Sequence, residues 1–504
     1  MPTLSLKNKV FVFFISLIIL VIFYFLFSFK LLDVPPGINS DEASSGFNGV
    51  LLSKNLRDEN NRFLPFFVLT LDGKDWRNPV YQYTMVLIFK VLGASYYNLR
   101  LVSVIFALLS IVLIFFLLYK FEGWKLAVLG VTLLATTPIL MIQAHLAHEN
   151  IAPVPFIIIF LLGILLYQRK GKWRYLTLSA LSLGISFYSY KALRLFVPVW
   201  AVLTYLYIVY LNSKFDFSKQ TIIKSFKAIL VFSIALLPFF AIIPILELKY
   251  AGAIAGGSNP SIDSYQNFFY YYLSNFDPAF LYVSGDATPY HSTGKHGALL
   301  LTSLPLFLIG AYQAIRKNSF VVFCLACFLF APLFFGLVGS FHRANRLLAM
   351  LPPYIVVASY GGYRLWELRN RARSLWKKKA LSASFLTGAI LLTLNYVDFL
   401  GFYYFKYPVE VRAHFSNNSH DSYFMLSKEA KKNKLEPFIE SDIYRSDGYA
   451  AKFFESSYFD RKILKWTPGT KVPATSILLT NSEILEGMKK IDLKIPVYSL
   501  QIPK

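Results

Sequence analysis

The sequence is poor in charged residues. Only 16% of its 504 residues are Asp, Glu, Lys or Arg, whereas 56% are hydrophobic. A soluble globular protein of this length would have about a quarter of its residues charged. The shortage of charge therefore excludes an ordinary soluble domain, and the apolar content predicts a polytopic α-helical protein solvated by lipid.

Acidic residues are also scarce relative to basic ones. The chain has 28 Asp and Glu against 51 Lys and Arg, which gives a formal net charge of +23. In a soluble protein this excess would indicate a nucleic-acid partner. Here the basic residues fall mainly in short loops between apolar runs, where they orient membrane helices, so we expect no nucleic-acid binding.

Cysteine is almost absent. The two cysteines, Cys324 and Cys327, lie in the apolar run 320–334. Their spacing places both on one face of a helix. Small apolar side chains in such a run are typical of core packing, which we favour over redox or metal chemistry.

About eleven apolar runs are long enough to be predicted as transmembrane helices, which need about 20 residues. The first follows Lys7 and Lys9, is too long for a signal-peptide core and is not followed by a small-residue cleavage site. We expect it to be an anchor with a cytoplasmic N-terminus. The predicted spans are residues 10–32, 98–119, 124–143, 150–168, 175–191, 194–211, 227–248, 298–315, 319–338, 344–363 and 381–404.

The loops between alternate spans support this count. All five loops on one side are basic, which is typical of cytoplasmic loops. An odd number of spans then places everything after Phe405 outside the cytoplasm. The basic loops are residues 120–125, 169–174, 214–227, 316–317 and 364–379.

Two long loops and the C-terminal segment are expected on the outer side. Residues 33–79 mix charges with Gly and Pro and are predicted to form a cap of short helices, before an interfacial segment at 80–92. Residues 249–297 are rich in Tyr, which is common at a membrane surface. The chain is thus divided into a membrane domain, residues 1–404, and a soluble outer domain, residues 405–504.

The outer domain is predicted to be a small α/β domain. Residues 476–480 and 495–498 have the apolar and β-branched character of strands, while 427–434 and 481–490 have the pattern of helices.

Two adjacent carboxylates, Asp41 and Glu42, follow the first predicted span. A carboxylate at a low-dielectric boundary is suited to act as a general base on a hydroxyl or amine. The same stretch also fits a helix N-cap, because Asn39, Ser40 and Asp41 all favour that role ahead of Ala43. Both interpretations stay open from the residues alone.

Arg77 and Tyr81 close the same loop, and Glu149 follows two histidines in a later one. Arg77 offers a bidentate fork for a lipid phosphate, although most such arginines simply extend to the membrane interface. Glu149 is a candidate because an ionisable residue at this depth is often functional. A metal site with His145 and His148 is disfavoured, since this spacing does not converge the three side chains.

Tyr190 and Arg194 combine a hydroxylated aromatic ring with a cation at another outer turn. They fit sugar or phosphate binding, or an ordinary aromatic belt. Asp286, His291 and Lys295 lie in the second long loop, which could close over a substrate. Turn formation alone also explains the Gly and Pro of that loop.

His342, Arg343 and Arg346 open the tenth predicted span, ahead of Pro352 and Pro353. Two prolines free backbone carbonyls that must be buried or line a cavity. The predicted topology places all these candidates at one outer face. Carboxylates beside several cations suit transfer from a lipid-linked phosphate, because cations stabilise the leaving phosphate while a carboxylate deprotonates the acceptor.

This arrangement resembles the GT-C glycosyltransferases, specifically glycosyltransferase family 39, which includes protein O-mannosyltransferases and lipid A aminoarabinose transferases. The resemblance extends over about Val10 to Tyr404 and rests on the order and placement of several short motifs. These are Asp41-Glu42, Arg77-Asn78-Pro79-Val80-Tyr81, Lys90-Val91-Leu92-Gly93, Leu99-Arg100-Leu101, His148-Glu149-Asn150, Tyr190 to Pro198, Asn345-Arg346 and Leu351-Pro352-Pro353.

The resemblance implies a polyprenyl-phosphate-linked sugar donor, an inverting transfer outside the cytoplasm, and Asp41 as the catalytic base. It also implies that Glu42 and Glu149 are further acidic groups of the site. The donor phosphate and lipid would be bound by residues chosen from Arg77, Tyr81, Tyr190, Arg194, His342, Arg343 and Arg346. The acceptor class, whether protein, lipid or glycan, stays open.

Some positions depart from the family pattern. Arg77 stands where relatives often have Lys, and Asn78 replaces the first Pro of the motif that follows. The last loop lacks the His-Glu-Arg pattern of the aminoarabinose branch, and the lumenal repeats of eukaryotic mannosyltransferases are absent. No metal is required, since phosphate is a fair leaving group, but a divalent cation is left open because some GT-C enzymes use one.

The main rival interpretation is a transporter or flippase for a lipid-linked sugar. Such a protein should show inverted repeats or broken helices in matching halves, and the sequence shows no such repeat. A non-catalytic assembly partner that binds lipid-linked sugars is a third possibility. We expect a bacterial plasma membrane, because retention signals and eukaryotic insertions are lacking.

Overall fold

The computed structural model describes residues 18, 20–214, 218–254, 264–338, 343–417, 419–473, 475–491 and 498–503. The contacts within the chain divide it into two compact units. The first unit consists of Met1–Phe29, Ser103–Ala144 and Glu149–Phe402. The second consists of Lys30–Val102, His145–His148 and Tyr403–Lys504.

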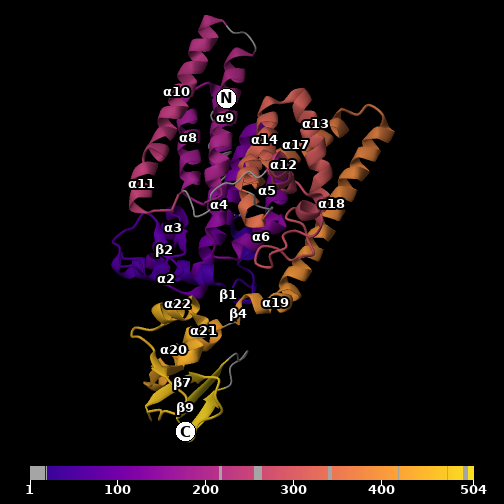
Figure 1. Ribbon diagram of the computed structural model, residues 1–504. Helices are drawn as coiled ribbons and strands as arrows, with labels where there is room; N and C mark the ends of the chain where they lie inside the picture. The colour runs from indigo at the N-terminus through magenta and orange to yellow at the C-terminus, as the bar shows by residue number, and fades with distance from the viewer. Residues whose placement is uncertain are drawn as a thin grey trace. The chain divides into compact units, whose positions relative to one another are not determined.

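The first unit is helical (Figure 1). The long helices α8, α9 and α10 pack against one another, as do α13, α14 and α17. The helices are α4 (Tyr96–Glu122, which begins in the second unit), α5 (Trp124–Ala135), α6 (Pro138–Ala144), α7 (Pro153–Lys170), α8 (Trp173–Phe187), α9 (Leu193–Ser213), α10 (Lys219–Ala241), α11 (Ile243–Lys249), α12 (Tyr265–Ser274), α13 (Leu304–Lys317), α14 (Ser319–Phe330), α15 (Phe335–Val338), α16 (Ala344–Leu347), α17 (Leu351–Arg371) and α18 (Leu375–Phe405, which ends in the second unit). Short 3₁₀ or π segments are η1 (Glu149–Ile151), η2 (Ala279–Val283), η3 (Leu301–Ser303), η4 (Ala331–Phe334) and η5 (Leu348–Met350).

Six helical segments in the described residues are long and apolar enough to cross a membrane. A seventh arises if α5 and α6 are one span, bent by 62° where Pro138 interrupts the helix. Helix also covers at least part of every predicted span, although residues 10–17 and 19 of the first lie outside the described residues. The chain is therefore an integral membrane protein, and the count of eleven stays a prediction.

Three of the basic loops lie together at one end of the first unit. Arg169 donates to the carbonyl oxygens of Lys120 and Phe121, and the Phe121 and Phe320 ring centroids lie 5.2 Å apart. The Gln168 amide donates to the Ser319 hydroxyl at 3.3 Å. Loops that the charge pattern assigns to one side of a membrane thus lie together, and we call this the basic end.

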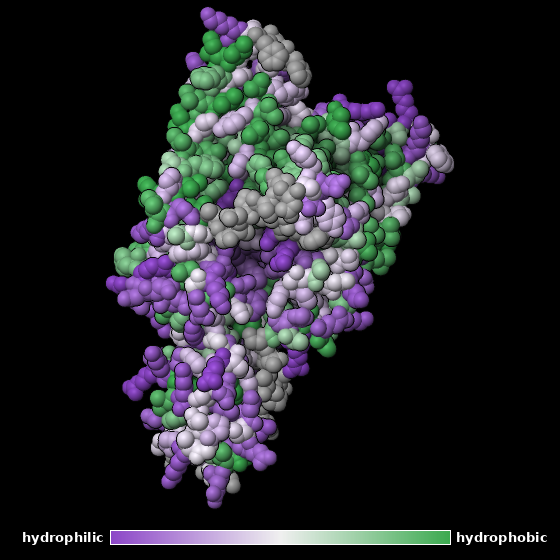
Figure 2. Space-filling view, in the orientation of Figure 1, coloured by the Kyte–Doolittle hydropathy of each residue, from purple (hydrophilic) through white to green (hydrophobic). Residues whose placement is uncertain are grey.

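The helix surfaces agree with a lipid environment. Figure 2 shows mainly apolar residues over the visible face of α10. The side chains of Phe226, Ile234 and Leu237 on this helix are about 60% exposed, a costly arrangement in water but a natural one in hydrocarbon. Both cysteines lie buried in α14, as core packing requires.

The second unit combines the first loop with the C-terminal segment. Its described elements are β1 (Gly37–Ile38), α2 (Ser40–Asn55), β2 (Val68–Thr70), β3 (Asp75–Arg77), α3 (Pro79–Leu92), α19 (Tyr407–Glu410), η6 (Arg412–His414), β4 (Ser416–Asn417), α20 (Ser419–Asn433), β5 (Glu436–Glu440), α21 (Ser441–Asp447), α22 (Tyr449–Tyr458), β6 (Leu464–Trp466), β7 (Ser476–Thr480), β8 (Met488–Ile491) and β9 (Ser499–Pro503). The five C-terminal strands form one sheet in the order β6, β5, β7, β9, β8. Strand β5 is parallel to β6 and β7, whereas β9 is antiparallel to β7 and β8. This is the small α/β fold that the composition predicts.

The first loop packs directly on the C-terminal α/β part. Strand β1 pairs with β4, and the Tyr449 hydroxyl donates to the Glu59 carboxylate at 3.0 Å. Gly46 on α2 faces α22 so closely that a Cβ there would lie 2.8 Å from the Phe453 ring. Because these segments are in contact, the first loop and the C-terminal part lie on the same side of any membrane.

Two local predictions differ from the structure. The first loop is not a set of short helices, because α2 has 16 residues and a β2–β3 hairpin follows it. Residues 481–490 are not a helix, since β8 begins at Met488. The Gln501 side chain donates to the Ser482 and Glu483 carbonyls and accepts from the Leu485 amide, so contacts from β9 replace local helix hydrogen bonds.

Candidate active site

The start of α2 is fixed by a capping box. The Asn39 side chain accepts from the Glu42 amide at 2.9 Å, and the Glu42 carboxylate accepts from the Asn39 amide at 3.2 Å. This reciprocal pair satisfies donors that a helix start leaves open. The N-cap role is therefore filled by Asn39, which leaves the Asp41 side chain to make other contacts.

Asp41 lies in the first turn of α2 and is ion-paired with Arg77. Its Oδ1 accepts from Arg77 Nη2 at 2.7 Å, and the Asp41 side chain is 51% exposed. The helix start also favours a negative charge, since the macrodipole is positive there. Asp41 is thus a half-exposed carboxylate held in a defined position.

Arg77 is almost fully buried, with a side chain 9% exposed. It ends strand β3, whose pairing with β2 places Arg77 opposite Val68. Its guanidinium also donates to the Ser44 hydroxyl at 2.9 Å and pairs with Asp75 at 3.1 Å. Two carboxylates and a hydroxyl therefore hold one planar cation, a geometry that Arg suits through its fixed fork of donors.

Glu42 has a contrasting environment. Its side chain is fully buried and pairs with the fully buried Arg100 at 3.1 Å. It also accepts from the Ala147 amide at 2.8 Å. Arg100 in turn donates to the carbonyl oxygens of Leu31, Pro35 and Gly37. Both charges of the pair are therefore compensated. Through these contacts the pair connects the end of the first span to α2 and α4.

His148 lies beside the cap of α2. Its Nε2 is 3.1 Å from Asn39 Nδ2 and 3.2 Å from Asn39 Oδ1. Burial lowers the pKa of His148 below its ordinary value, more than the nearby carboxylates of Asp41 and Glu42 raise it. The imidazole is therefore neutral at neutral pH, and the ionic groups of this part of the site are three carboxylates and two arginines.

Another group of predicted residues gathers in the first unit. Asp286 accepts from the amides of Thr288 and Ala344, at 2.7 and 2.6 Å, and so ties the second long loop to the start of α16. His291 Nδ1 lies 3.2 Å from the Gln143 amide, whose oxygen accepts from Asn150 at 2.7 Å. The second long loop is thus in contact with the segment that begins α16, a contact that the sequence did not predict.

The other predicted residues lie at separate places. In the second unit, Tyr81 is buried on α3. Within the first unit, Arg194 at the start of α9 donates to the Ala253 and Ile254 carbonyls, and Glu149 opens η1. The remaining ones are Tyr190, half-buried ahead of α9, Lys295, exposed in the second long loop, Arg343, the exposed N-cap of α16, Arg346, half-buried within α16, and His342, which lies outside the described residues.

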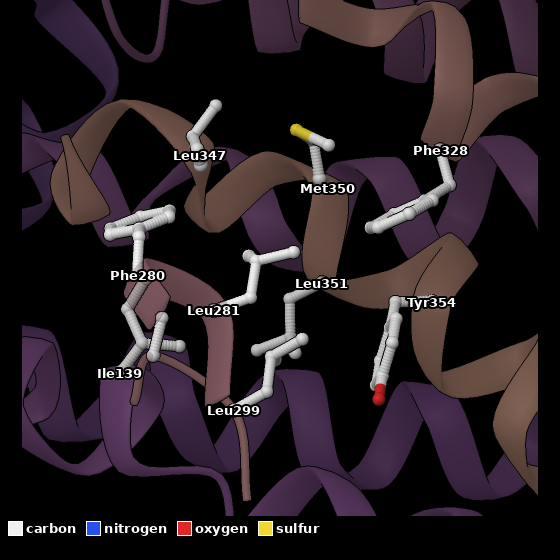
Figure 3. Close-up of a pocket in the computed structure, with 10 residues that line it drawn as sticks. Ile139, Phe280, Leu281, Leu299, Phe328, Leu347, Met350, Leu351 and Tyr354 are labelled. Carbon is white, nitrogen blue, oxygen red and sulfur yellow. The ribbon is translucent and has the colours of Figure 1, made fainter. Parts of the chain in front are cut away.

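An apolar pocket lies between η2 and the start of α17. Figure 3 shows Phe280, Leu281, Phe328 and Leu351 around it. Its free space, about 20 Å³, is enough for about one water molecule, and it has no titratable lining group except Tyr354. The Tyr354 hydroxyl is within 2.7 Å of the Ser303 hydroxyl. This pocket is therefore not suited to bind a sugar or a phosphate.

Comparisons with known proteins give a consistent picture. Residues 77–244 match the model of a family described as dolichyl-phosphate-mannose-protein mannosyltransferase. The crystal structure of ArnT from Cupriavidus metallidurans in the apo state matches with a TM-score of 0.53 and 11% identity, over 89% of this chain and 85% of that one. ArnT bound to undecaprenyl phosphate matches with a TM-score of 0.53 and 10% identity, over 96% and 97%. Comparison with the curated proteins gave no match.

The chain has the GT-C glycosyltransferase fold. The resemblance inferred from the motifs is thereby confirmed. The family match to this GT-C chain begins at Arg77 and includes Arg100, Glu149 and Arg194, but it does not reach Asp41. The roles of the site residues therefore rest on the geometry described above.

Arg100 belongs to the motif Leu99-Arg100-Leu101, but the sequence alone assigned it no role in the site. Arg100 follows Leu99 and precedes Leu101 and Val102, and an arginine inside an apolar helix is itself a signal of a buried partner. Asn39, as the cap, and His148, as its neighbour, were likewise not assigned to the site.

The donor set around Asp41 does not favour a metal ion. Asp41 and Glu42 are paired with arginines, and His148 contacts Asn39. Within the described ranges, no group of three His, Cys, Asp or Glu is arranged to hold a metal.

Proposed function

We propose that this protein transfers a sugar from a polyprenyl-phosphate-linked donor to an acceptor hydroxyl or amine, with Asp41 as the general base. The observation that carries the proposal is the half-exposed Asp41 carboxylate, held against the buried Arg77 at the start of α2. The donor class is supported by the match to ArnT bound to undecaprenyl phosphate and by the dolichyl-phosphate-mannose family match.

The proposed reaction is a single displacement. Asp41 accepts the proton of the acceptor nucleophile, which forms a bond to the anomeric carbon of the sugar. The bond between that carbon and the phosphate oxygen breaks, and polyprenyl phosphate leaves with the electron pair. Attack opposite the leaving group inverts the anomeric configuration, and a positioned base of this kind accelerates the step by about 10²–10⁴-fold.

The two neighbouring carboxylates are not equivalent in this proposal. A base must reach the acceptor, and the Asp41 side chain is exposed enough to do so. Glu42 is buried and occupied by Arg100 and the Ala147 amide. We therefore assign Glu42 to positioning α2 rather than to proton transfer.

Arg77 is proposed to bind the donor phosphate and to stabilise its developing charge, because a guanidinium suits phosphate oxygens and the Arg77 cation is held in the same site as Asp41. Arg194, Arg343 and Arg346, and likewise Glu149, keep their proposed roles as separate predictions. No step requires a metal. The contact between the first loop and the C-terminal part supports an acceptor site to which the C-terminal part contributes, outside the cytoplasm.

The test uses the purified full chain in proteoliposomes with polyprenyl phosphate that carries a radiolabelled sugar. Membrane extract is added outside as the source of acceptor. The proposal expects labelled product together with free polyprenyl phosphate. Label that crosses the bilayer with its sugar–phosphate bond intact would instead identify a flippase and contradict the proposal.

A matched pair of variants assigns the base. Asp41→Asn and Asp75→Asn each remove one carboxylate from Arg77. Asp41→Asn should reduce transfer about 10²–10⁴-fold, whereas Asp75→Asn should reduce it less than about tenfold. Equal losses would mean that Asp41 serves only to hold Arg77.

A further inference from the structure

A groove runs along the membrane helices at the basic end of the first unit. It lies between the last turns of α9 and the junction of α13 and α14, and its volume is about 630 Å³. That size is within the range of small-molecule sites in proteins. None of the residues assigned to sugar transfer lines it.

The groove changes character along its length. At one end lie the exposed cations Arg316 and Lys317, together with Asn318 and Ser319. About seven residues further along α9 and α14, roughly 10 Å by helical rise, its walls are apolar and include Leu203 and Ala326. A cationic mouth that leads into an apolar channel is complementary to an amphiphile with an anionic head.

The floor of the groove is a stack of aromatic rings. The Tyr207 and Phe323 centroids lie 4.7 Å apart, and those of Tyr207 and Tyr210 lie 6.2 Å apart. The Tyr207 hydroxyl contacts the Ser319 hydroxyl at 3.2 Å, so the polar edge of the floor faces the cationic end. The floor is thus aromatic, and its polar edge lies toward the cationic end.

The charge at the mouth is one-sided. Among the described residues, neither Arg316 nor Lys317 lies within ion-pair distance of an acid, and the Arg316 guanidinium lies 4.4 Å from the Tyr312 ring centroid. No acidic residue lines the groove. An anionic headgroup would supply the counter-charge, and each cation near an anionic lipid surface contributes about fivefold in affinity.

We propose that this groove is a binding site for one anionic phospholipid. Arg316 and Lys317 bind its phosphate, and an acyl chain lies along the channel over Tyr207 and Phe323. The lipid would come from the leaflet at the basic end. This site is independent of sugar transfer and would persist if the proposed activity proved wrong.

Native mass spectrometry of the detergent-solubilised full chain tests the proposal, with phosphatidylglycerol and phosphatidylcholine as probes. The wild type should retain one phosphatidylglycerol in preference to phosphatidylcholine. The double variant R316A/K317A should bind it about 25-fold more weakly, from two losses of about fivefold. The matched control K377A/K378A removes two exposed cations from the start of α18 and should stay within about threefold of wild type.

A second variant separates the chain-binding part from the charges. Ala326→Trp fills the channel while both cations stay, so it should also lose phosphatidylglycerol, and millimolar inorganic phosphate should not displace the lipid from the wild type. Equal binding of both lipids, equal losses in the two double variants, displacement by phosphate, or a second copy of the chain in place of the lipid would each overturn the proposal.

Discussion

Two acid–arginine pairs begin at consecutive residues of α2 and have opposite surroundings. Asp41 is half-exposed and meets a buried Arg77, whereas Glu42 and Arg100 are both fully buried. The buried pair is surrounded by backbone partners from three segments, including the Ala147 amide and the Leu31 carbonyl. In the other pair, the Asp41 carboxylate remains accessible to solvent. Adjacent carboxylates can therefore have different roles: Glu42 holds the start of α2 in place, and Asp41 is accessible for chemistry.

The largest difference between the two pairs is expected when one partner of the buried pair is neutralised. Glu42→Gln leaves the Arg100 charge uncompensated in a buried site, and we expect a loss of about 3–5 kcal/mol in the free energy of unfolding. Asp41→Asn, the same chemical change one residue earlier, should cost less than about 1 kcal/mol, because its pair is half-exposed. Thermal unfolding of both variants in detergent measures the difference. Equal destabilisation would mean that the two pairs do the same structural work.

The contact that supports α2 from the C-terminal part offers a second test. Gly46→Val would place side-chain atoms against the Phe453 ring, and overpacking of this kind costs about 1–3 kcal/mol. The control Gly388→Val changes a glycine of α18 that has open space around it and should cost little. Limited proteolysis should release the C-terminal part faster in Gly46→Val alone. If both variants resist proteolysis like the wild type, α22 does not hold α2 in place.

Two substitutions of Arg77 test its role in the pair with Asp41. Arg77→Lys keeps the charge but loses the planar fork, which should lower the transfer rate. Because members of the family that this sequence resembles often have Lys at this position, we expect the loss to be limited to roughly tenfold. Arg77→Met removes the charge as well and should lower the rate about a hundredfold or more. The rates are measured with labelled donor. A Met variant as active as the Lys variant would remove the phosphate role proposed for Arg77.

A smaller effect is expected from His148, which contacts Asn39, the cap of α2. Burial lowers its pKa in the folded state below the ordinary value of about 6.5, so the unfolded chain binds the proton more tightly. Stability from this group is full above that ordinary pKa and is lost as the pH falls through it. The unfolding temperature of the wild type should therefore drop more between pH 7.5 and 5.5 than that of His148→Gln. An identical drop would show that His148 does not contribute to this pH dependence.

Much of the helical arrangement could be predicted from the sequence. Apolar runs mark the helices because hydrocarbon leaves backbone groups only one another as partners. The charge of short loops such as 169–174 and 316–317 predicted which helix ends lie together, and Gln168 and Ser319 are in contact. The length of α2 and the strand at Met488 were not predicted, since contacts from distant segments decide them.

The candidate site was predictable by residue type but not by pairing. Asp41 and Arg77 were each recognisable, yet 36 residues and a hairpin separate them. The partner of Glu42 lies 58 residues away, near the start of a mostly apolar helix. The N-x-x-E pattern of the capping box was visible in Asn39 and Glu42, but only the fold shows that the cap leaves Asp41 exposed.

Paired binding and single-turnover measurements on Asp41→Asn test the central claim most directly. Purified wild type and variant are mixed with labelled donor and with the membrane extract that supplies the acceptor, and bound and cleaved donor are counted separately. We expect the variant to bind the donor within about threefold of the wild type and to cleave it at least about a hundredfold more slowly. Cleavage by Asp41→Asn at the wild-type rate would contradict the role of Asp41 as the base.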